Sequence, residues 1–339
     1  MIQGKDLIAQ AQSGTGKTAA FAISMLELID PSVNEVQGLV LAPTRELAQQ
    51  IGLVFTQLGE YLKIKVHAFV GGTSIKADIK NFTENVQIVV GTPGRVLDMI
   101  NKKILKLSYL KIFTLDEADE MLSRGFLESI KTMVGLIPVN CQIALFSATM
   151  SKEIISITKL FMNDPVKILV KNEELTLEGI RQYYIPMKKE WKIDILLNLY
   201  KMMEITQAMI YCNTKKAVDF VAEEMKKNGF VVSSIHSEMD MQERNRIMKD
   251  FRGGVSRVLI TTDLLARGID IYQVSLVINF DIPRQKETYI HRIGRSGRFG
   301  RKGTAINFIS PDDMVELENI QKYYNTLIQE LPTDLSQIK

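Results

Sequence analysis

Four carboxylates gather within the short sequence TLDEADEML, which runs from Thr114 to Leu122. This sequence follows the apolar run YLKIFTL, which is typical of a buried strand. Like charges this close repel one another, and burying a carboxylate is costly without a partner. We therefore expect a cation to bind at the end of this strand. The four acids are Asp116, Glu117, Asp119 and Glu120.

The sequence AQSGTGKT, from Ala11 to Thr18, suggests what that cation accompanies. A glycine loop between a strand and a helix N-terminus cradles phosphates with its backbone N–H groups. Lys17 would reach the β- and γ-phosphates of a nucleotide, and Thr18 would offer its hydroxyl to Mg²⁺. The general phosphate-loop pattern starts with glycine, whereas this chain has Ala11. The alternative interpretation is an ordinary tight turn.

Beside a phosphate loop, the acidic cluster predicts a magnesium–nucleotide site. Asp116 ends a predicted parallel strand, where such sheets bind ligands, so we expect it to hold Mg²⁺ together with Thr18. Glu117 would orient and deprotonate the attacking water. Asp119 would face a basic partner, and Glu120 is interpreted as a solvated carboxylate in the first turn of a helix. Helix capping is the alternative, and it accounts for one or two of the acids.

The sequence HRIGRSGRFGRK, from His291 to Lys302, is strongly basic and contains no acid. Arg295 and Arg298 would lie one turn apart on a helix, so both would address one phosphate group. An arginine brought to a γ-phosphate accelerates hydrolysis by about 10³–10⁵. The alternative is a solvated basic face.

Four shorter sequences also follow predicted strands. SAT (147–149) would couple the acidic site to other parts of the protein, or else cap a strand end. APTRELA (42–48), VGGTS (70–74) and GTPGR (91–95) combine backbone N–H groups, hydroxyls and arginines. Such groups suit a sugar–phosphate backbone and read no bases, although each sequence alone is compatible with an ordinary loop.

Short apolar runs alternate with amphipathic helical patterns along the 339 residues, which predicts parallel sheets covered by helices on both faces. The pattern occurs once in each half of the chain. Because a single core rarely grows beyond about 250–300 residues, we expect two α/β domains. We place them at residues 1–165 and 181–339, joined by a polar linker at 166–180.

Composition narrows the class of protein. A hydrophobic content of 46% and a charged content of 24% are typical of a soluble globular chain, and a net charge of +3 requires any basic footprint to be local. Cys141 and Cys212 are interpreted as buried reduced thiols, and no cysteine pair or histidine cluster predicts a structural metal. The uncharged span 132–151 is interpreted as a loop and a buried strand, so no membrane segment is expected.

Taken together, SGTGKT, PTRELA, TPGR, DEAD, SAT, ARGID and HRIGRSGR resemble, in this order, the motifs of the DEAD-box RNA helicases. These motifs span nearly the whole chain. The resemblance implies two tandem RecA-like domains that close over ATP and one RNA strand. It also implies ATP and Mg²⁺ as cofactors, and RNA-stimulated ATP hydrolysis coupled to local unwinding of RNA duplexes.

The resemblance assigns roles to the matching residues. It implies catalytic roles for Lys17, Asp116, Glu117, Arg295 and Arg298, with Thr18 and Asp116 holding the metal. The nucleotide would be bound by Ser13, Gly14, Thr15, Gly16, Lys17, Thr18, Asp270, Arg295 and Arg298. Coupling is implied for Asp119, Ser147, Thr149 and His291. RNA would be bound by Thr44, Arg45, Gly72, Thr92, Gly94, Arg95, Arg244 and Thr262.

Longer sequences, among them LDEADEMLSRGF and TTDLLARGID, are similar to the family members that act on mRNA in translation initiation. That similarity implies a scaffold initiation factor as a partner and a cytoplasmic location. Exon-junction and nucleolar relatives share much of this sequence, and Ser296 favours them. A relative of that kind would act in the nucleus as an ATP-gated RNA clamp in mRNA or rRNA processing.

The chain departs from the family pattern twice. It begins just before GKDLIAQAQSGTGKT, whereas the family carries an adenine-recognising glutamine motif upstream, so we expect the chain to be part of a longer protein. Met241 also stands where the family usually has a glutamine, while Arg244 is retained. We therefore expect one RNA contact to be lost.

Three other functions stay open on the residues alone. The chain would be a clamp that stays on RNA without turnover, a DNA-directed motor, or a phosphate-loop ATPase unrelated to nucleic acid. Release of phosphate, stimulation by DNA and insensitivity to polynucleotides distinguish these functions. Contacts to 2′-hydroxyls would decide between RNA and DNA.

Overall fold

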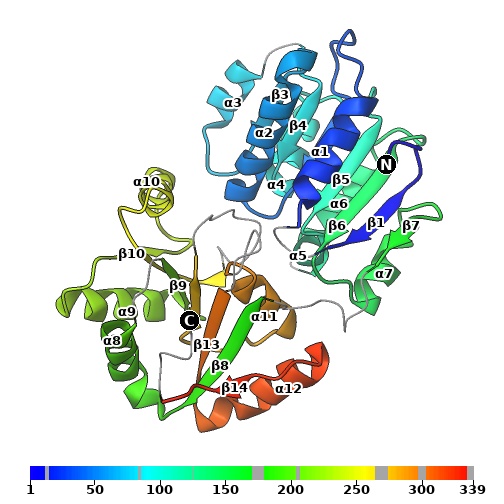
Figure 1. Cartoon of the computed structure of the whole chain (residues 1–339). Coiled ribbons are helices and arrows are strands. Elements are labelled where there is room, and N and C mark those ends of the chain that lie inside the picture. The colour runs from blue at the N-terminus through cyan, green and yellow to red at the C-terminus, as the bar shows by residue number, and fades with distance from the viewer. Residues whose placement is uncertain are drawn as a thin grey trace. The chain divides into compact units, whose positions relative to one another are not determined.

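The computed structural model describes residues 1–11, 15–82, 85–123, 125–169, 179–203, 207–263, 274–296 and 303–333. The chain forms two compact units, Met1–Val170 and Lys171–Lys339. Each unit, called a domain below, is built on one seven-stranded sheet (Figure 1).

The first sheet is parallel throughout, in the strand order β3-β4-β2-β5-β6-β1-β7. Its inner strands are fully buried, which is why they are apolar runs without polar alternation. The strands are β1 (Leu7–Gln10), β2 (Gly38–Leu41), β3 (Val66–Phe69), β4 (Ile88–Gly91), β5 (Ile112–Asp116), β6 (Gln142–Ser147) and β7 (Val166–Ile168).

Helices cover both faces of this sheet. Successive residues of β2 point to opposite faces, so Val40 packs in one apolar core and Leu39 and Leu41 in the other. The Val40 core includes α1 (Lys17–Leu28) and α2 (Arg45–Gly59), which continues into the 3₁₀ turn η1 (Glu60–Leu62). The other core includes α4 (Pro93–Asn101), α5 (Ala118–Ser123), α6 (Leu127–Val134) and α7 (Lys152–Thr158). The short helix α3 (Ile75–Asn81) follows β3.

The second sheet repeats the first. Its order is β10-β11-β9-β12-β13-β8-β14, again with parallel pairs only, so each strand corresponds to the one seven earlier in the chain. The strands are β8 (Ile180–Pro186), β9 (Ala208–Tyr211), β10 (Val232–Ile235), β11 (Val258–Thr261), β12 (Leu276–Asn279), β13 (Gly303–Ile309) and β14 (Gln329–Glu330).

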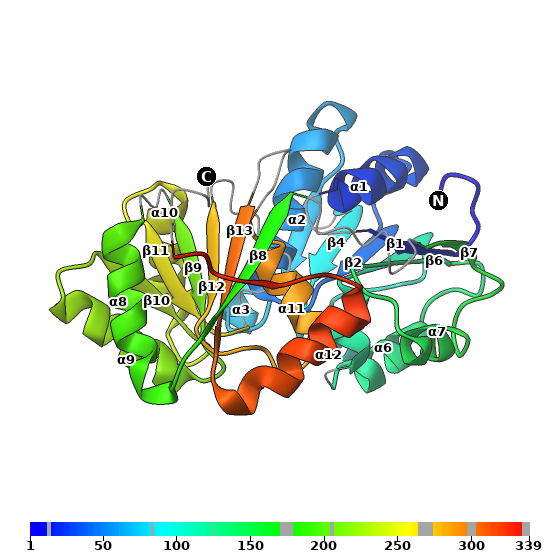
Figure 2. The ribbon, with the colours of Figure 1, turned by 60° about the horizontal axis from the view of Figure 1, so that its bottom comes forward.

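The helices of the second domain also divide between two cores (Figure 2). One core includes α8 (Lys192–Met202) and α9 (Lys215–Lys227), and the other includes α10 (Met241–Arg252), α11 (Lys286–Ile293) and α12 (Met314–Tyr324). Two 3₁₀ turns, η3 (Lys189–Trp191) and η5 (Pro311–Asp313), precede α8 and α12.

The predicted α/β fold with helix-covered parallel sheets is confirmed, but the predicted linker is wrong at its two ends. Residues Val166–Ile168 form β7 and pair with β1, and β8 begins at Ile180. Every residue of β7 is exposed, because the strand lies at the edge of its sheet. Strands β7 and β14 lie at the edges of their sheets, and β8, which lies between β13 and β14, is only partly buried, so none of the three carries the continuous apolar run that predicts a buried strand.

Two smaller predictions also agree with the structure. Cys141 and Cys212 are buried and unpaired. The uncharged span 132–151 contains the end of α6, a connection and the buried strand β6. None of the helices in the described ranges is long and apolar enough to cross a membrane.

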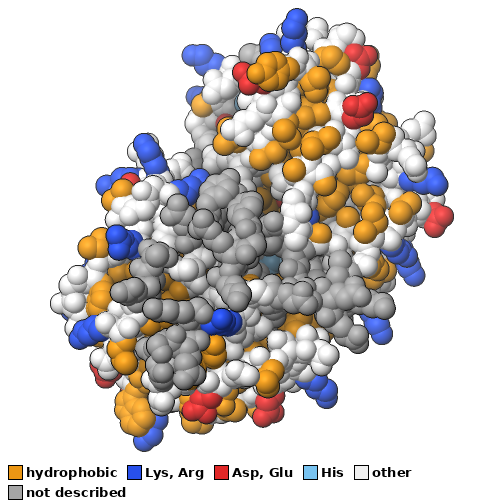
Figure 3. Space-filling view, viewed as in Figure 1, with side chains coloured by type: hydrophobic (Ala, Val, Ile, Leu, Met, Phe, Trp, Pro, Cys, Tyr) orange, Lys and Arg blue, Asp and Glu red, His pale blue; other side chains and the backbone are white. Residues whose placement is uncertain are grey.

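Lysine and arginine side chains are scattered over the described part of the face seen in Figure 3, in keeping with the small net charge. Apolar side chains gather on the first domain in the same view. Exposed apolar residues of that domain include Ile2, Val166 and Ile168, which line one groove beside Leu7.

Candidate functional site

The order of the strands sorts the predicted residues of the first domain into two groups. Parallel strands all end at one edge of the sheet, and functional loops follow those ends. The phosphate loop, the acidic cluster and SAT follow β1, β5 and β6, which are neighbours. PTRELA, GGT and TPGR follow β2, β3 and β4, which are neighbours on the other side of β5.

The described part of the phosphate loop ends in an uncapped helix N-terminus. Gly16 precedes α1 with φ 94°, a left-handed conformation that favours glycine. The first turn of α1 contains no acid, and no side chain caps it. Its N–H groups and positive dipole therefore suit an anion. Thr15 and Gly16 are exposed and Thr18 is half-buried, whereas Ser13 and Gly14 lie outside the described residues.

Lys17 shows what this N-terminus is built to bind. Its side chain is 7% exposed, and its Nζ makes no hydrogen bond to the described residues. The carboxylate oxygen Oε1 of Glu117 lies 3.9 Å away, beyond hydrogen-bond distance. A buried ammonium needs acceptors, so phosphate oxygens fit this position.

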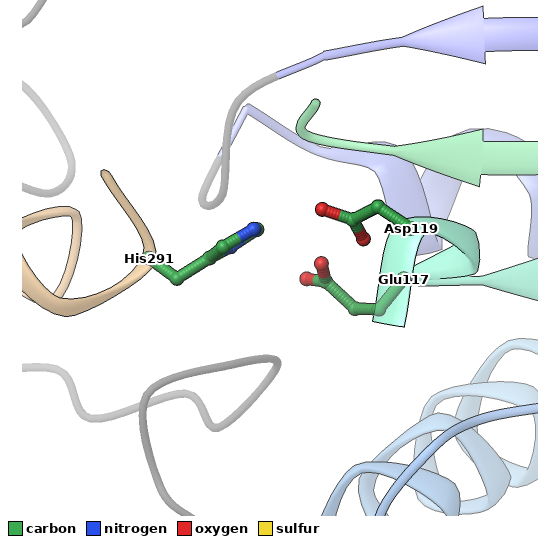
Figure 4. A group of neighbouring side chains, drawn as sticks. All are labelled: Glu117, Asp119 and His291. Carbon is green, nitrogen blue, oxygen red and sulfur yellow. The ribbon is translucent and has the colours of Figure 1, made fainter. Parts of the chain in front are cut away.

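A left-handed residue sets the shape of the acidic turn. Asp116 ends β5, Glu117 has φ 53°, and α5 starts at Ala118. The N–H of Glu117 donates to Oδ1 of Asp116 (3.0 Å). A left-handed non-glycine residue costs about 1–3 kcal/mol, and such strain gathers at functional sites. Figure 4 shows the carboxylates of Glu117 and Asp119 on the same side of this turn.

The acidic residues are buried, as their predicted role requires. Asp116 and Glu117 are 2% exposed and Asp119 is 3% exposed, while Glu120 is half-buried. Burial raises the pKa of Asp116 to about 7, and the neighbouring Glu117 charge adds to the rise. A divalent cation would remove this penalty, so the residues fit Mg²⁺ held by Asp116 with Thr18.

Asp119 joins two motifs that are distant in sequence. Its Oδ2 accepts a hydrogen bond from Oγ1 of Thr149, and its N–H donates to Oγ of Ser147 (3.4 Å). All three residues are buried. The structure therefore brings together three of the four residues predicted to couple motifs. The fourth, His291, lies on α11 of the second domain, where it is buried.

The second group in the first domain forms one connected surface. Thr44 caps α2 and Thr92 precedes α4; Oγ1 of Thr92 accepts the N–H of Gly71 (3.2 Å). Gly72 has φ 81°, and a Cβ at that position would lie 2.2 Å from Nη1 of Arg45. The Arg45 side chain therefore lies against the Gly71–Gly72 backbone. Gly94 and Arg95 are the next residues of this group, in the first turn of α4.

The predicted residues of the second domain follow the corresponding strands. Arg244 lies on α10 after β10, and Thr262 follows β11, the counterparts of β3 and β4. Met241 is the first residue of α10. Asp270 and Arg298 lie outside the described residues.

Arg295 does not lie on helix α11, contrary to the helical spacing predicted for Arg295 and Arg298; because Arg298 lies outside the described residues, the shared phosphate contact of the two arginines stays a prediction. Helix α11 ends at Ile293, where Gly294 caps it, and Arg295 lies in the following turn with its N–H donating to the carbonyl oxygen of Arg292 (3.2 Å). This helix end favours glycine because a Cβ at Gly294 would lie 2.8 Å from the carbonyl oxygen of Ile290.

Arg292 of the same motif has a role that its place in the sequence does not predict. It is fully buried, and its guanidinium donates to side chains at or just after the ends of β9, β11 and β12 and to the carbonyl oxygen of Asp281. It therefore fastens three strand ends of the second domain. Only its place in a motif rich in arginine would have singled it out. The side-chain partners are Asn213, Asp263 and Asn279.

We expect Arg292→Met to destabilise the second domain. Breaking a buried ion pair by removing one partner costs about 3–5 kcal/mol, because Asp263 loses its cation. Urea unfolding followed by the fluorescence of Trp191, the single tryptophan and a second-domain residue, measures this. The exposed Arg257→Met is the control, and equal midpoints for both variants would contradict the assigned role.

We expect Asp116→Asn to stabilise the protein when nucleotide and divalent cations are absent. Between the ordinary value of 3.8 and about 7, folded Asp116 keeps a proton that the unfolded chain releases, so the wild type loses stability as pH rises. At about 1.4 kcal/mol per pKa unit, the variant gains up to about 4 kcal/mol at neutral pH.

Urea unfolding at several pH values measures this gain. It should grow from about pH 4 to about pH 7 and then stay constant. The exposed Asp194→Asn should show no such trend. A gain that shrinks as pH rises would contradict the raised pKa.

Each half of the chain matches the model of a protein family. Residues 1–157 match the model of the DEAD/DEAH box helicase, and residues 191–300 match the helicase conserved C-terminal domain.

Relatives that carry the eIF4A name match over nearly the full chain. The ATP-dependent RNA helicase eIF4A of Mycosarcoma maydis is 55% identical over 339 residues, which are 100% of this chain and 82% of the relative. Eukaryotic initiation factor 4A of Drosophila melanogaster is 54% identical over 338 residues, 99% of this chain and 84% of the relative.

A solved structure of Saccharomyces cerevisiae Dbp5 bound to RNA and ADP BeF3 is also similar. It has a TM-score of 0.92 at 40% identity, covering 98% of this chain and 87% of that one. With the motif geometry described above, these similarities establish that the chain belongs to the DEAD-box helicase family.

Proposed function

We propose that this protein is an RNA-dependent ATPase that unwinds short RNA duplexes during translation initiation. The observation that carries the proposal is the buried group of Lys17, Asp116 and Glu117, in which the ammonium has no hydrogen bond within the described residues and one acid has a raised pKa. Relatives that carry the initiation-factor name over the full chain support the biological setting. They do not favour a nuclear clamp.

Each residue of the nucleotide site has a separate task. Lys17 and the N–H groups of α1 bind the β- and γ-phosphates, and Thr18 and Asp116 hold Mg²⁺. Bound Mg²⁺ neutralises charge that develops on the phosphate oxygens. Glu117, placed by its left-handed backbone, orients the attacking water and accepts its proton. Arg295, with Arg298 and Asp270, completes the contacts to the phosphates and ribose.

The RNA backbone binds along the other group of strand ends. In the first domain the residues proposed to contact RNA are Thr44, Arg45, Gly72, Thr92, Gly94 and Arg95. In the second domain they are Arg244 and Thr262. Asp119, Ser147 and Thr149 connect the end of β5 to the end of β6, within the group of strands β5, β6 and β1 whose ends carry the nucleotide residues. If each ligand favours the same arrangement, each raises the affinity for the other.

The size of the binding energy limits the unwinding step. Micromolar binding supplies about 8 kcal/mol, and one base step costs about 1.4 kcal/mol in DNA. One cycle therefore offsets only a few base pairs, which favours local melting. We further propose a scaffold initiation factor as partner and the cytoplasm as the place of action, on the strength of the relatives' names.

We expect Glu117→Gln to bind ATP with nearly unchanged affinity and to lose at least about 10² in turnover, since a neutral amide cannot accept the proton of water. Phosphate release with single-stranded RNA and nucleotide binding at equilibrium measure the two effects. Glu120→Gln, in the next turn, is the matched control and should retain activity. Unchanged turnover in Glu117→Gln would remove Glu117 as the base.

We expect Gly72→Ala to weaken RNA binding without changing ATP binding. Its Cβ would displace the Arg45 guanidinium, and φ 81° is strained for alanine. Arg45→Ala should cause a similar loss and should flatten the log–log salt dependence by about 0.7, the value for one phosphate on a single strand. RNA titrations at several salt concentrations measure both variants. Equal RNA affinity of wild type and Gly72→Ala would contradict this surface.

A further inference from the structure

Arg95 has its guanidinium engaged inside the first domain. Nη1 donates to Oδ2 of Asp78, with which it forms an ion pair, and to Oγ1 of Thr73 (2.9 Å). Nη2 donates to the carbonyl oxygen of Thr73 (2.8 Å). The side chains of Arg95 and Asp78 are only 9% and 11% exposed. The charge of Arg95 is therefore neutralised by Asp78 and shielded from solvent.

These contacts hold the glycine turn that supports Arg45. Thr73 directly follows Gly71 and Gly72, and its Oγ1 lies 2.9 Å from both the carbonyl oxygen of Val70 and Oδ2 of Asp78. Thr92 accepts the N–H of Gly71 one turn before Arg95 on the same helix N-terminus. The turn is thus held at two points: Thr92 binds Gly71, just before Gly72, and Arg95 binds Thr73, just after it.

Arg45 and Arg95 differ in how they contact the glycine turn. Arg45 lies against Gly72, where a Cβ would strike its guanidinium, so its position depends on the turn. Arg95 is bound to the turn through Thr73 and to Asp78 on α3. A guanidinium paired with a buried carboxylate adds little net charge toward a phosphate, and leaving that carboxylate unpaired is costly.

We propose that Arg95 is a positioning residue, which with Asp78 locks the 70–73 turn so that Arg45 and the backbone N–H groups present one preformed surface to the RNA backbone. The inference rests on the proposed RNA surface. According to this proposal, the negatively charged Asp78 strengthens the binding of RNA, which is itself negatively charged, because it holds Arg95 in place.

Asp78→Asn tests the proposal through the sign of its effect. If Arg95 contacts phosphate directly, removing a negative charge beside it strengthens RNA binding. If Arg95 is a lock, Asp78→Asn weakens RNA binding by about tenfold, in the range for residues that act through a contact network. We expect the weakening, and tighter or unchanged binding would overturn the proposal.

Two further variants distinguish the lock from a charge contact. Arg95→Lys keeps the charge but loses the planar fork, so it should bind RNA about as weakly as Asp78→Asn, with a salt dependence parallel to that of the wild type. A direct phosphate contact would instead be rescued by lysine. In the double variant, Arg95→Lys with Asp78→Asn, the loss should be no larger than in either single variant.

Asp98→Asn is the matched control, because it removes the same charge from α4, where Asp98 pairs with Lys102 away from the turn. It should leave RNA affinity unchanged or slightly raise it. ATP binding and thermal unfolding of each variant report whether the domain is folded. If the wild type fails to bind RNA, the proposed function fails; if the wild type binds and Asp78→Asn binds equally or better, only the lock fails.

Discussion

Buried negative charge at the end of β5 is the constraint on which the first domain depends. Asp116, Glu117 and Asp119 are almost entirely withdrawn from water, and Asp116 is hard to ionise there. The protein sets Lys17 near this charge without giving its ammonium a hydrogen bond among the described residues. A magnesium nucleotide, the ligand proposed for this site, would satisfy this ammonium and this acidic group together. Such a site would be costly when empty and stabilised by its ligand.

The parallel sheet makes this arrangement possible, and the second domain contains a sheet with the same strand order. With every strand running the same way, all functional loops emerge at one edge, and the strand order decides which loops are neighbours. In the first domain β5 separates the nucleotide residues from the residues that follow β2, β4 and β3. The second sheet has the same order, so Arg244 and Thr262 occupy the places of the glycine turn and the α4 N-terminus. Asp119, through Ser147 and Thr149, joins β5 to β6.

Arginine residues serve two purposes in this fold. Arg292 is buried among strand ends of the second domain, and Arg95 is paired with Asp78 in the first. Each lies three residues from a motif residue for which a ligand contact is proposed: Arg292 from Arg295, and Arg95 from Thr92. Their five N–H donors in a rigid planar group suit them to fixing several loops at once. A motif arginine is thus as able to hold a loop as to bind a phosphate.

The order of strands and helices, the phosphate loop and the acidic turn were predictable from local sequence, because apolar runs, helical periodicity and short motifs act over a few residues. β7, β8 and β14 were not, since the edge strands β7 and β14 and the partly buried β8 have little apolar character and become strands only through their partners. The left-handed Glu117, the end of α11 before Arg295 and the pairing of Arg95 with Asp78 also depended on the fold. Hydrogen bonds between residues distant in sequence are set by the packing of whole elements, and the residue types alone do not specify which partner each arginine takes.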